Sequence, residues 1–197
     1  MIGRLKTRSR KLIDPPARGL ARIGVSPNVL TFAGLAFALV AGWILARGHL
    51  QLALIPLAAS GLADMLDGAV ARATGRSSPF GAALDSTIDR VADAAVFGGL
   101  LLGWLNDPPG GALLYVLLIL VAMVASFLVS YVRARAEGLG FECQVGLMER
   151  PSRMVLLGLV FVIGEAALLP GLALVCVLTA ATVVQRLAHV GRRARAA

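Results

Sequence analysis

The sequence Asp64-Met-Leu-Asp67-Gly-Ala-Val-Ala71-Arg72, followed after eight residues by Gly81-Ala-Ala-Leu-Asp85-Ser-Thr-Ile-Asp89-Arg-Val-Ala-Asp93, carries five of the chain's eleven acidic residues. The whole chain is 58% hydrophobic and only 15% charged. Carboxylates in apolar surroundings are costly unless they are paired or bound to metal. Residues three or four apart share a helix face, so each half predicts a helix with its acids on one side. The short polar segment between the halves predicts two antiparallel, neighbouring helices.

The rest of the 197-residue chain contains several apolar stretches close to the roughly 20 residues that a helix needs to cross a bilayer. We predict an all-α integral membrane protein with six transmembrane helices and an N-terminal amphipathic juxtamembrane segment broken at Pro15–Pro16. A disordered basic tail is the alternative for that segment. The predicted spans are residues 29–46, 50–73, 81–104, 112–132, 154–169 and 172–187, with a turn at Pro170–Gly171 between the last two. The predicted organisation is a juxtamembrane segment (1–28), a six-helix catalytic domain (29–190) and a basic tail (191–197).

Basic residues are distributed unevenly over the predicted loops. Of the 19 Lys and Arg residues, Arg47 alone falls on one side of the predicted membrane. Lys and Arg collect in cytoplasmic loops, so we expect the aspartates and both termini to face the cytoplasm from the plasma (inner) membrane. This rule also accounts for the net charge of +8, so we expect no binding to nucleic acid. Cys143 and Cys176 lack the spacing of a disulfide framework or a metal site.

The acidic side chains predict a metal site near the cytoplasmic ends of the two helices. Several carboxylates held close together repel one another, and a divalent cation relieves that repulsion. Ligation by carboxylate oxygens suits Mg²⁺ or Mn²⁺. Arg72 and Arg76 follow two of the acids in a polar turn. Metal beside arginine is the arrangement expected for binding a diphosphate.

The spacing of these residues resembles the motif of the CDP-alcohol phosphatidyltransferase family. The eight matching positions are Asp64, Asp67, Gly68, Ala71, Arg72, Gly81, Asp85 and Asp89. The resemblance implies an enzyme that transfers the phosphatidyl group from CDP-diacylglycerol to an alcohol and releases CMP, and it implies a homodimer. It implies two ions held by Asp64, Asp67, Asp85 and Asp89, with Asp89 also acting as the general base. The residues implied to contact the CDP-lipid are Asn28, Val29, Leu30, Thr31, Gly68, Ala71, Arg72, Ser78 and Gly81, and Asp93 would support the site from outside the motif.

Arginines at three separate helix ends predict that the acceptor alcohol carries a phosphate. They are Arg133, Arg150, Arg153 and Arg186. Guanidinium groups recognise phosphate through paired donors. Each arginine alone is better explained as an interfacial anchor, and the convergence of three helix ends favours a phosphate site instead. The surrounding stretches are similar to the actinobacterial phosphatidylinositol phosphate synthases, which implies inositol 1-phosphate as acceptor and phosphatidylinositol phosphate as product. In those enzymes the first phosphate-binding position is often Lys, whereas here it is Arg133.

Two alternatives to this function remain. A phosphatidylglycerophosphate synthase would use glycerol 3-phosphate, which is also a phosphate-bearing alcohol. A cation transporter would use the aspartates as a transit site, and it predicts acids spread across the depth of the membrane. The aspartates in this chain cluster at one end of two helices, which favours the enzyme.

Overall fold

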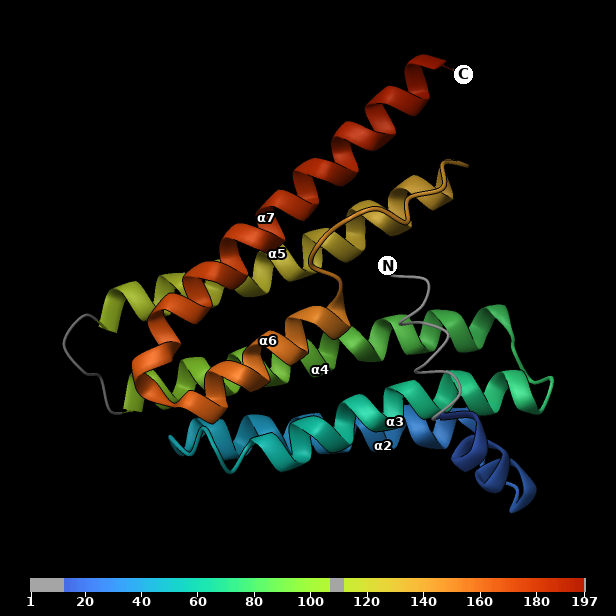
Figure 1. The fold of residues 1–197 in the computed structure, drawn as a ribbon, viewed down its shortest axis with the longest axis horizontal. Helices are drawn as coiled ribbons and strands as arrows, with labels where there is room; N and C mark the ends of the chain where they lie inside the picture. Colours follow the sequence, from blue (N-terminus) through green and yellow to red (C-terminus); the bar gives the residue numbers. More distant parts are fainter. Residues whose placement is uncertain (1–12, 107–111, 197) are drawn as a thin grey trace. The chain divides into compact units, whose positions relative to one another are not determined.

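A computed structural model describes residues 13–106 and 112–196, and these residues form helices joined by turns and loops, with no strand among them (Figure 1). The helices are residues 13–22, α2 (Pro27–Ala46), α3 (Leu54–Ala73), α4 (Pro79–Asn106), α5 (Ala112–Gly138), α6 (Arg150–Ile163) and α7 (Glu165–Ala196). The prediction of an all-α protein is confirmed for this part of the chain. Much of the predicted juxtamembrane segment falls on residues 1–12, outside the described residues.

Four of these helices are long and apolar enough to cross a membrane. Their spans are Pro27–Ala46, Leu54–Ala73, Leu113–Gly138 and Glu165–Arg195. Large apolar side chains such as Trp43 and Ile55 are exposed on them, as expected where lipid surrounds a helix. The chain is therefore a multi-pass membrane protein. α6 has 14 residues, a rise of about 21 Å against a hydrocarbon core of about 30 Å, so the count of six spans stays a prediction.

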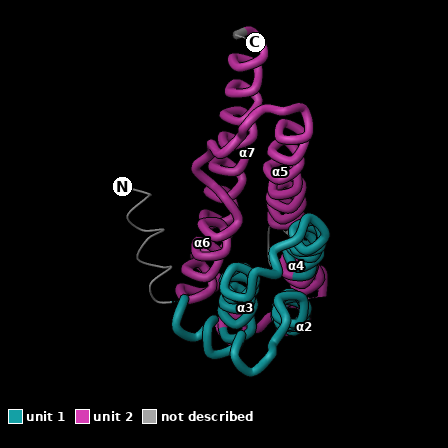
Figure 2. The backbone as a smooth tube through the Cα atoms, turned by 90° about the vertical axis from the view of Figure 1, so that its right-hand side faces the viewer, with its two compact units in different colours: residues 1–41, 55–95 teal, residues 42–54, 96–197 magenta. Residues whose placement is uncertain are grey.

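The chain divides into two compact units, which Figure 2 colours separately. Unit 1 comprises residues 1–41 and 55–95, and unit 2 comprises residues 42–54 and 96–197. In unit 1, α2 packs closely on α3, because a Cβ at Gly34 would lie 3.5 Å from the Ala63 Cβ and from the Ser60 carbonyl oxygen. The helix of residues 13–22 packs on α3 through an apolar cluster that includes Ala17 and Val70.

In unit 2, α7 packs along both α5 and α6 (Figure 1). The end of α2 packs on the second half of α4 through glycines. A Cβ at Gly99 would lie 2.1 Å from the carbonyl oxygen of Gly42, and a Cβ at Gly103 would lie 2.5 Å from that of Leu45. Glycine is therefore required at both positions for the two backbones to approach so closely.

The break between the last two helices lies at Gly164, so the predicted turn at Pro170–Gly171 was wrong. Gly164 ends α6 with a φ of 96°, a conformation that favours glycine. Pro170 lies inside α7, close to its beginning, where its missing N–H removes one helical hydrogen bond. Gly171 serves close packing instead, because a Cβ there would lie 2.3 Å from Cγ2 of Val160 on α6.

Two further local predictions concern the chain before α2. Residues 13–22 are helical through Pro15 and Pro16, so the predicted break at this pair was wrong. The φ of proline is already near the helical value, and proline is tolerated where a helical N–H would lack a partner. The predicted start of the next helix at Ser26–Pro27 is confirmed, since the Ser26 Oγ accepts a hydrogen bond from the N–H of Val29 at 3.4 Å.

Candidate active site

The turn between α3 and α4 is built to be short. The chain leaves α3 after Ala73 and passes through Gly75, whose φ of 66° favours glycine. The Ser78 Oγ then accepts a hydrogen bond from the N–H of Gly81 at 3.0 Å and caps the start of α4. This cap also explains Gly81, because a Cβ there would lie 3.1 Å from the Ser78 Oγ. The turn returns the chain so that the acids of both helices fall in one region.

The structure brings together three of the predicted metal ligands. Asp64 on α3 and Asp85 and Asp89 on α4 each offer a carboxylate oxygen, and these oxygens all lie within 4.8 Å of one another. All three residues are half-buried. Asp89 also lies 3.7 Å from the NH1 of Arg90 in an ion pair. Three half-buried carboxylates at this spacing form a donor set that fits a hard divalent cation.

The fourth predicted ligand, Asp67, has a different environment. Its Oδ2 accepts a hydrogen bond of 2.7 Å from the Oγ1 of Thr31 on α2. Asp67 is 6% exposed and Thr31 is 7% exposed, so this bond is shielded from solvent. The Asp67 carboxylate is still close enough to those of Asp64 and Asp85 for their charges to interact. Asp67 therefore borders the three-carboxylate group and ties it to the beginning of α2.

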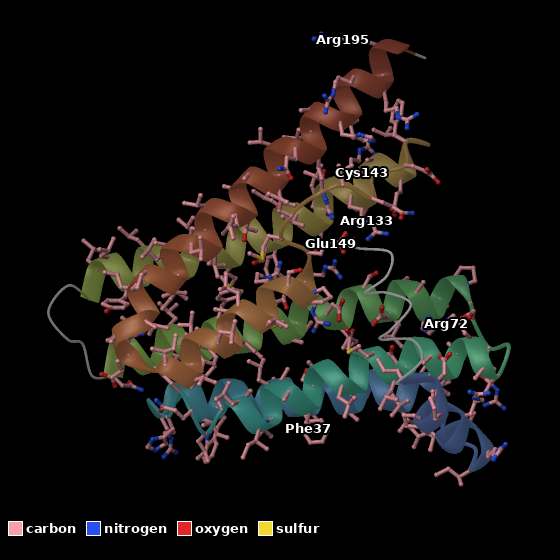
Figure 3. All side chains as sticks on the ribbon, viewed as in Figure 1. Phe37, Arg72, Arg133, Cys143, Glu149 and Arg195 are labelled. Atoms are coloured by element: carbon pink, nitrogen blue, oxygen red, sulfur yellow. The ribbon has the colours of Figure 1, made fainter. Side chains whose placement is uncertain are left out.

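Arg72, which Figure 3 labels at the end of α3, lies beside the backbone of Gly68 (Figure 3). A Cβ at Gly68 would lie 3.2 Å from the NH1 of Arg72, so the glycine leaves room for the guanidinium group. Arg72 also lines a pocket of about 340 Å³ between α3 and the helix of residues 13–22, and Arg18 and Asp14 line its other side. Arg18 was missed in the sequence, where it appeared only as one of several basic residues near the N-terminus.

The remaining residues predicted to surround the CDP-lipid also lie in unit 1. They are Asn28, Val29 and Leu30 on α2 and Ala71 on α3. Asp93, predicted to support the site from outside the motif, lies on α4 in the same unit. Val29 is 59% exposed, whereas Leu30 packs against the apolar cluster of helix 13–22 and α3. Asp93 is buried, with 3% exposed.

The four predicted acceptor arginines all belong to unit 2. Arg133 on α5 is half-exposed, and its Nε donates to the Oε1 of Glu137 at 2.8 Å. Arg150 begins α6 and is half-buried. Arg153 is 1% exposed and Arg186 is 2% exposed. Two buried guanidinium groups are unusual, since arginine is rarely fully buried without partners.

Arg186 on α7 contacts two other segments of unit 2 through three partners. Its Nε donates to the carbonyl oxygen of Val145 at 2.8 Å, and its NH1 donates to that of Val129 at 2.5 Å. Its NH2 lies 3.7 Å from the Oε1 of Glu149. The partners come from α5 and from the chain that precedes α6. The sequence singled out Arg186 but gave no sign of these partners, because backbone carbonyls leave no mark in a residue pattern.

Comparison with known proteins places the chain in a family. The family model described as CDP-alcohol phosphatidyltransferase matches residues 24–188. A phosphatidylinositol phosphate synthase from Mycobacteroides abscessus is 42% identical over 147 residues, which cover 74% of this chain and 66% of that protein.

Solved structures of the Mycobacterium tuberculosis phosphatidylinositol phosphate synthase are also similar. The one with CDP-DAG bound is 36% identical to this chain and has a TM-score of 0.79. The match covers 91% of this chain and 94% of the solved chain. The one in complex with manganese and citrate has the same TM-score and identity, with 90% and 88% covered. The chain therefore belongs to the CDP-alcohol phosphatidyltransferase family.

Proposed function

We propose that this enzyme transfers the phosphatidyl group from CDP-diacylglycerol to inositol 1-phosphate, giving phosphatidylinositol phosphate and CMP. The observation that carries the proposal is the group formed by Asp64, Asp85 and Asp89, whose carboxylate oxygens lie within 4.8 Å of one another. Membership of the family fixes the reaction class. The names of similar proteins, phosphatidylinositol phosphate synthases with 36–42% identity, support the donor and the acceptor.

The metal is a divalent ion, and we propose two ions of Mg²⁺ or Mn²⁺. Asp64, Asp67, Asp85 and Asp89 would hold them, and the donor set of carboxylate oxygens suits either metal. When bound, the metal neutralises the charge of the diphosphate and stabilises the leaving CMP. The hydrogen bond from Thr31 to Asp67 keeps that carboxylate in a fixed orientation.

The chain's own residues would perform the remaining steps on the donor side. Arg72 binds the diphosphate through its guanidinium group, in the space that Gly68 leaves open. Asp89 takes the proton from the acceptor hydroxyl. The hydroxyl oxygen then forms a bond to the lipid-side phosphorus while the bond from that phosphorus to the CMP oxygen breaks. Residues proposed to contact the CDP-lipid are Asn28, Val29, Leu30, Thr31, Ala71, Ser78 and Gly81, with Asp93 supporting the carboxylates.

The four arginines of unit 2 would bind the phosphate of the acceptor. They are Arg133, Arg150, Arg153 and Arg186. Arg133 is accessible, and Arg186 uses two of its five N–H groups on carbonyl oxygens, which leaves donors for a further partner. A buried or half-buried guanidinium group recognises phosphate more strongly than one in open water, because the local dielectric constant is lower.

An acceptor panel tests the proposal. Purified protein in detergent with CDP-diacylglycerol and Mg²⁺ should release CMP when inositol 1-phosphate is added. It should release no CMP when glycerol 3-phosphate or free inositol is added instead. Release with glycerol 3-phosphate alone would identify a phosphatidylglycerophosphate synthase instead. Arg133→Gln should weaken use of inositol phosphate, whereas Arg135→Gln, an exposed arginine on the same helix, should not.

A second experiment separates the enzyme from a cation transporter. Asp89→Asn should abolish CMP release, because the acceptor hydroxyl then lacks its base. A transporter would move divalent ions into proteoliposomes without CDP-lipid, and that result in the wild type would contradict the enzyme. Full CMP release by Asp89→Asn would show that another group is the base.

We further propose six membrane spans, with both termini and the site on the cytoplasmic side of the plasma membrane, in a homodimer. The predicted organisation into residues 1–28, 29–190 and 191–197 belongs to the same proposal. The asymmetry of basic residues supports this orientation, since Arg47 alone falls in a loop on the other side. Labelling of single cysteines at Arg47 and Arg192 from either side of intact vesicles would test it.

A further inference from the structure

Residues 139–149, which we call the strap, join α5 to α6 without helix or strand. In Figure 1 the strap runs back beside α5 before it turns into α6, and Figure 3 labels Cys143 and Glu149 on it (Figures 1 and 3). Connecting segments usually lie exposed on the surface. In this strap Cys143 is 0% exposed and Met148 is 4% exposed. The strap is therefore packed into unit 2.

Three side chains of α7 each contact one backbone atom of the strap. They are Thr182, which accepts from the Met148 N–H at 2.9 Å, Arg186, which donates to the Val145 oxygen at 2.8 Å, and His189, whose Nε2 lies 3.0 Å from the Glu142 oxygen. The α7 residues are spaced four and three apart, so they lie on one helix face. Their order along α7 is opposite to the order of their partners, so the strap runs antiparallel to α7.

The fit between strap and helix is close at its centre. Gly146 has a φ of 136°, and a Cβ there would lie 2.5 Å from Cγ2 of Thr182. Arg186 also donates to Val129 on α5, and its NH2 lies 3.7 Å from Glu149. These contacts fix the strap against two helices at once.

The strap ends where the first turn of α6 begins. Glu149 is the N-cap residue of α6, and its carbonyl oxygen accepts from the N–H of Arg153 at 3.0 Å. Arg150 is the first residue of the helix. The position of the strap therefore sets the position of the two α6 arginines.

We propose that Thr182 and His189, together with Arg186, are positioning residues for the acceptor: they fix the strap and, through it, Arg150 and Arg153. This rests on the proposed function, in which those two arginines bind the acceptor's phosphate. In this proposal Thr182 and His189 act only through their contacts with the strap backbone. Their loss should weaken acceptor binding while the metal and the CDP-lipid bind as before, since the aspartates and Arg72 belong to unit 1.

Thr179 supplies a matched control on the same helix. Thr179 and Thr182 are both 0% exposed, and both hydroxyls donate to a carbonyl oxygen one turn earlier in α7. Thr182 alone of this pair also accepts a hydrogen bond from the strap. Thr182→Val should raise the KM for inositol phosphate about tenfold, because it leaves a buried N–H unsatisfied. Its KM for CDP-diacylglycerol should stay within about twofold of the wild type, and Thr179→Val should leave both values unchanged.

His189→Ala provides a variant that should fold even if Thr182→Val does not, because His189 is half-exposed. It should raise the acceptor KM about threefold, since one partly solvated hydrogen bond is lost. Equal effects of Thr182→Val and Thr179→Val would overturn the proposal, and so would equal rises in both KM values. The proposal would also be overturned if the two single variants, His189→Ala and Thr182→Val, both had the acceptor KM of the wild type.

Hydrogen–deuterium exchange of the strap separates this proposal from the proposed function. The peptide over residues 139–149 should exchange slowly in the wild type and in Thr179→Val, and about tenfold faster in Thr182→Val. If the wild type releases no CMP with inositol phosphate, the proposed function fails, and the exchange rates still decide whether α7 holds the strap. If the strap exchanged slowly in Thr182→Val, the contacts from α7 would not be what holds the strap.

Discussion

Replacing Asp85 with Asn should change the stability of the protein in opposite directions with and without metal. The carboxylate of Asp85 approaches those of Asp64 and Asp89 to within 4.8 Å. When a chelator keeps the protein free of metal, the substitution removes repulsion between like charges. The variant should then be more stable than the wild type. With a divalent ion present, the variant should gain less stability because it has lost one of the proposed anionic ligands.

The size of the effect follows from the spacing. At 4.8 Å two unit charges repel by about 0.9 kcal/mol in a water-like dielectric and by about 3.5 kcal/mol at an effective dielectric constant of about 20. The three side chains are half-buried, so solvent screens their charges. We therefore take the repulsion as about 1 kcal/mol for each pair. Within the group of Asp64, Asp85 and Asp89, Asp85 takes part in two pairs. Removing these two repulsions should stabilise the metal-free Asp85→Asn variant by about 2 kcal/mol. A divalent ion at a concentration of about 100 times its Kd stabilises the wild type by about 2.7 kcal/mol. The Asp85→Asn variant should lose most of this gain.

Unfolding in detergent micelles, followed in EDTA and in a Mn²⁺ titration, measures both effects. Electron paramagnetic resonance of free Mn²⁺ reports binding independently. Asp14→Asn is the matched control. It removes the same charge, but from a residue that is exposed on the helix of residues 13–22. It should behave as the wild type in both solutions. A loss of stability for Asp85→Asn in EDTA would refute the idea that the metal-free carboxylates repel one another.

Two predictions test the close helix contacts by unfolding in the same micelles. Gly99→Ala should destabilise the protein by more than about 2 kcal/mol, because its Cβ would lie 2.1 Å from the Gly42 carbonyl oxygen, which cannot move aside. Gly98→Ala, next to it with open space, should change stability by less than about 0.5 kcal/mol; equal losses would contradict the packing. Gly171→Ala should also destabilise, and Val160→Ala in the same chain should recover about 1 kcal/mol of that loss.

Features that depend on residues near one another in the sequence were predicted well. The helical spacing of the acids and the short turn between them predicted that acids of two neighbouring helices come together. Carboxylate oxygens of three of them, Asp64, Asp85 and Asp89, lie within 4.8 Å of one another. The start of α2 at Pro27 followed from a serine before a proline. Both depend on helical spacing and on capping, which are local rules.

Features that depend on partners far apart in the sequence were not predicted. Pro170 and Gly171 look like a turn, but the glycine accommodates Val160 on the preceding helix. Gly164 shows no such dipeptide, yet its backbone conformation ends α6. The hydrogen bond from Thr31 to Asp67 also depends on how α2 packs on α3. Composition cannot distinguish a glycine in a turn from a glycine between two helices, because both need the missing side chain.

The same close packing explains how helices can hold carboxylates in an apolar chain. Between helices in a bilayer the hydrophobic effect contributes little, so association depends on contact between backbones and on polar bonds. In unit 1, Gly34 lets α2 lie against α3 near Asp64, and Thr31 adds a buried hydrogen bond to Asp67 on the same pair of helices. The packing of α2 on α3 therefore fixes the α3 carboxylates, and this packing does not depend on the metal. A metal site whose ligands sit on such helices is preorganised, and binding an ion then costs little ordering of the chain.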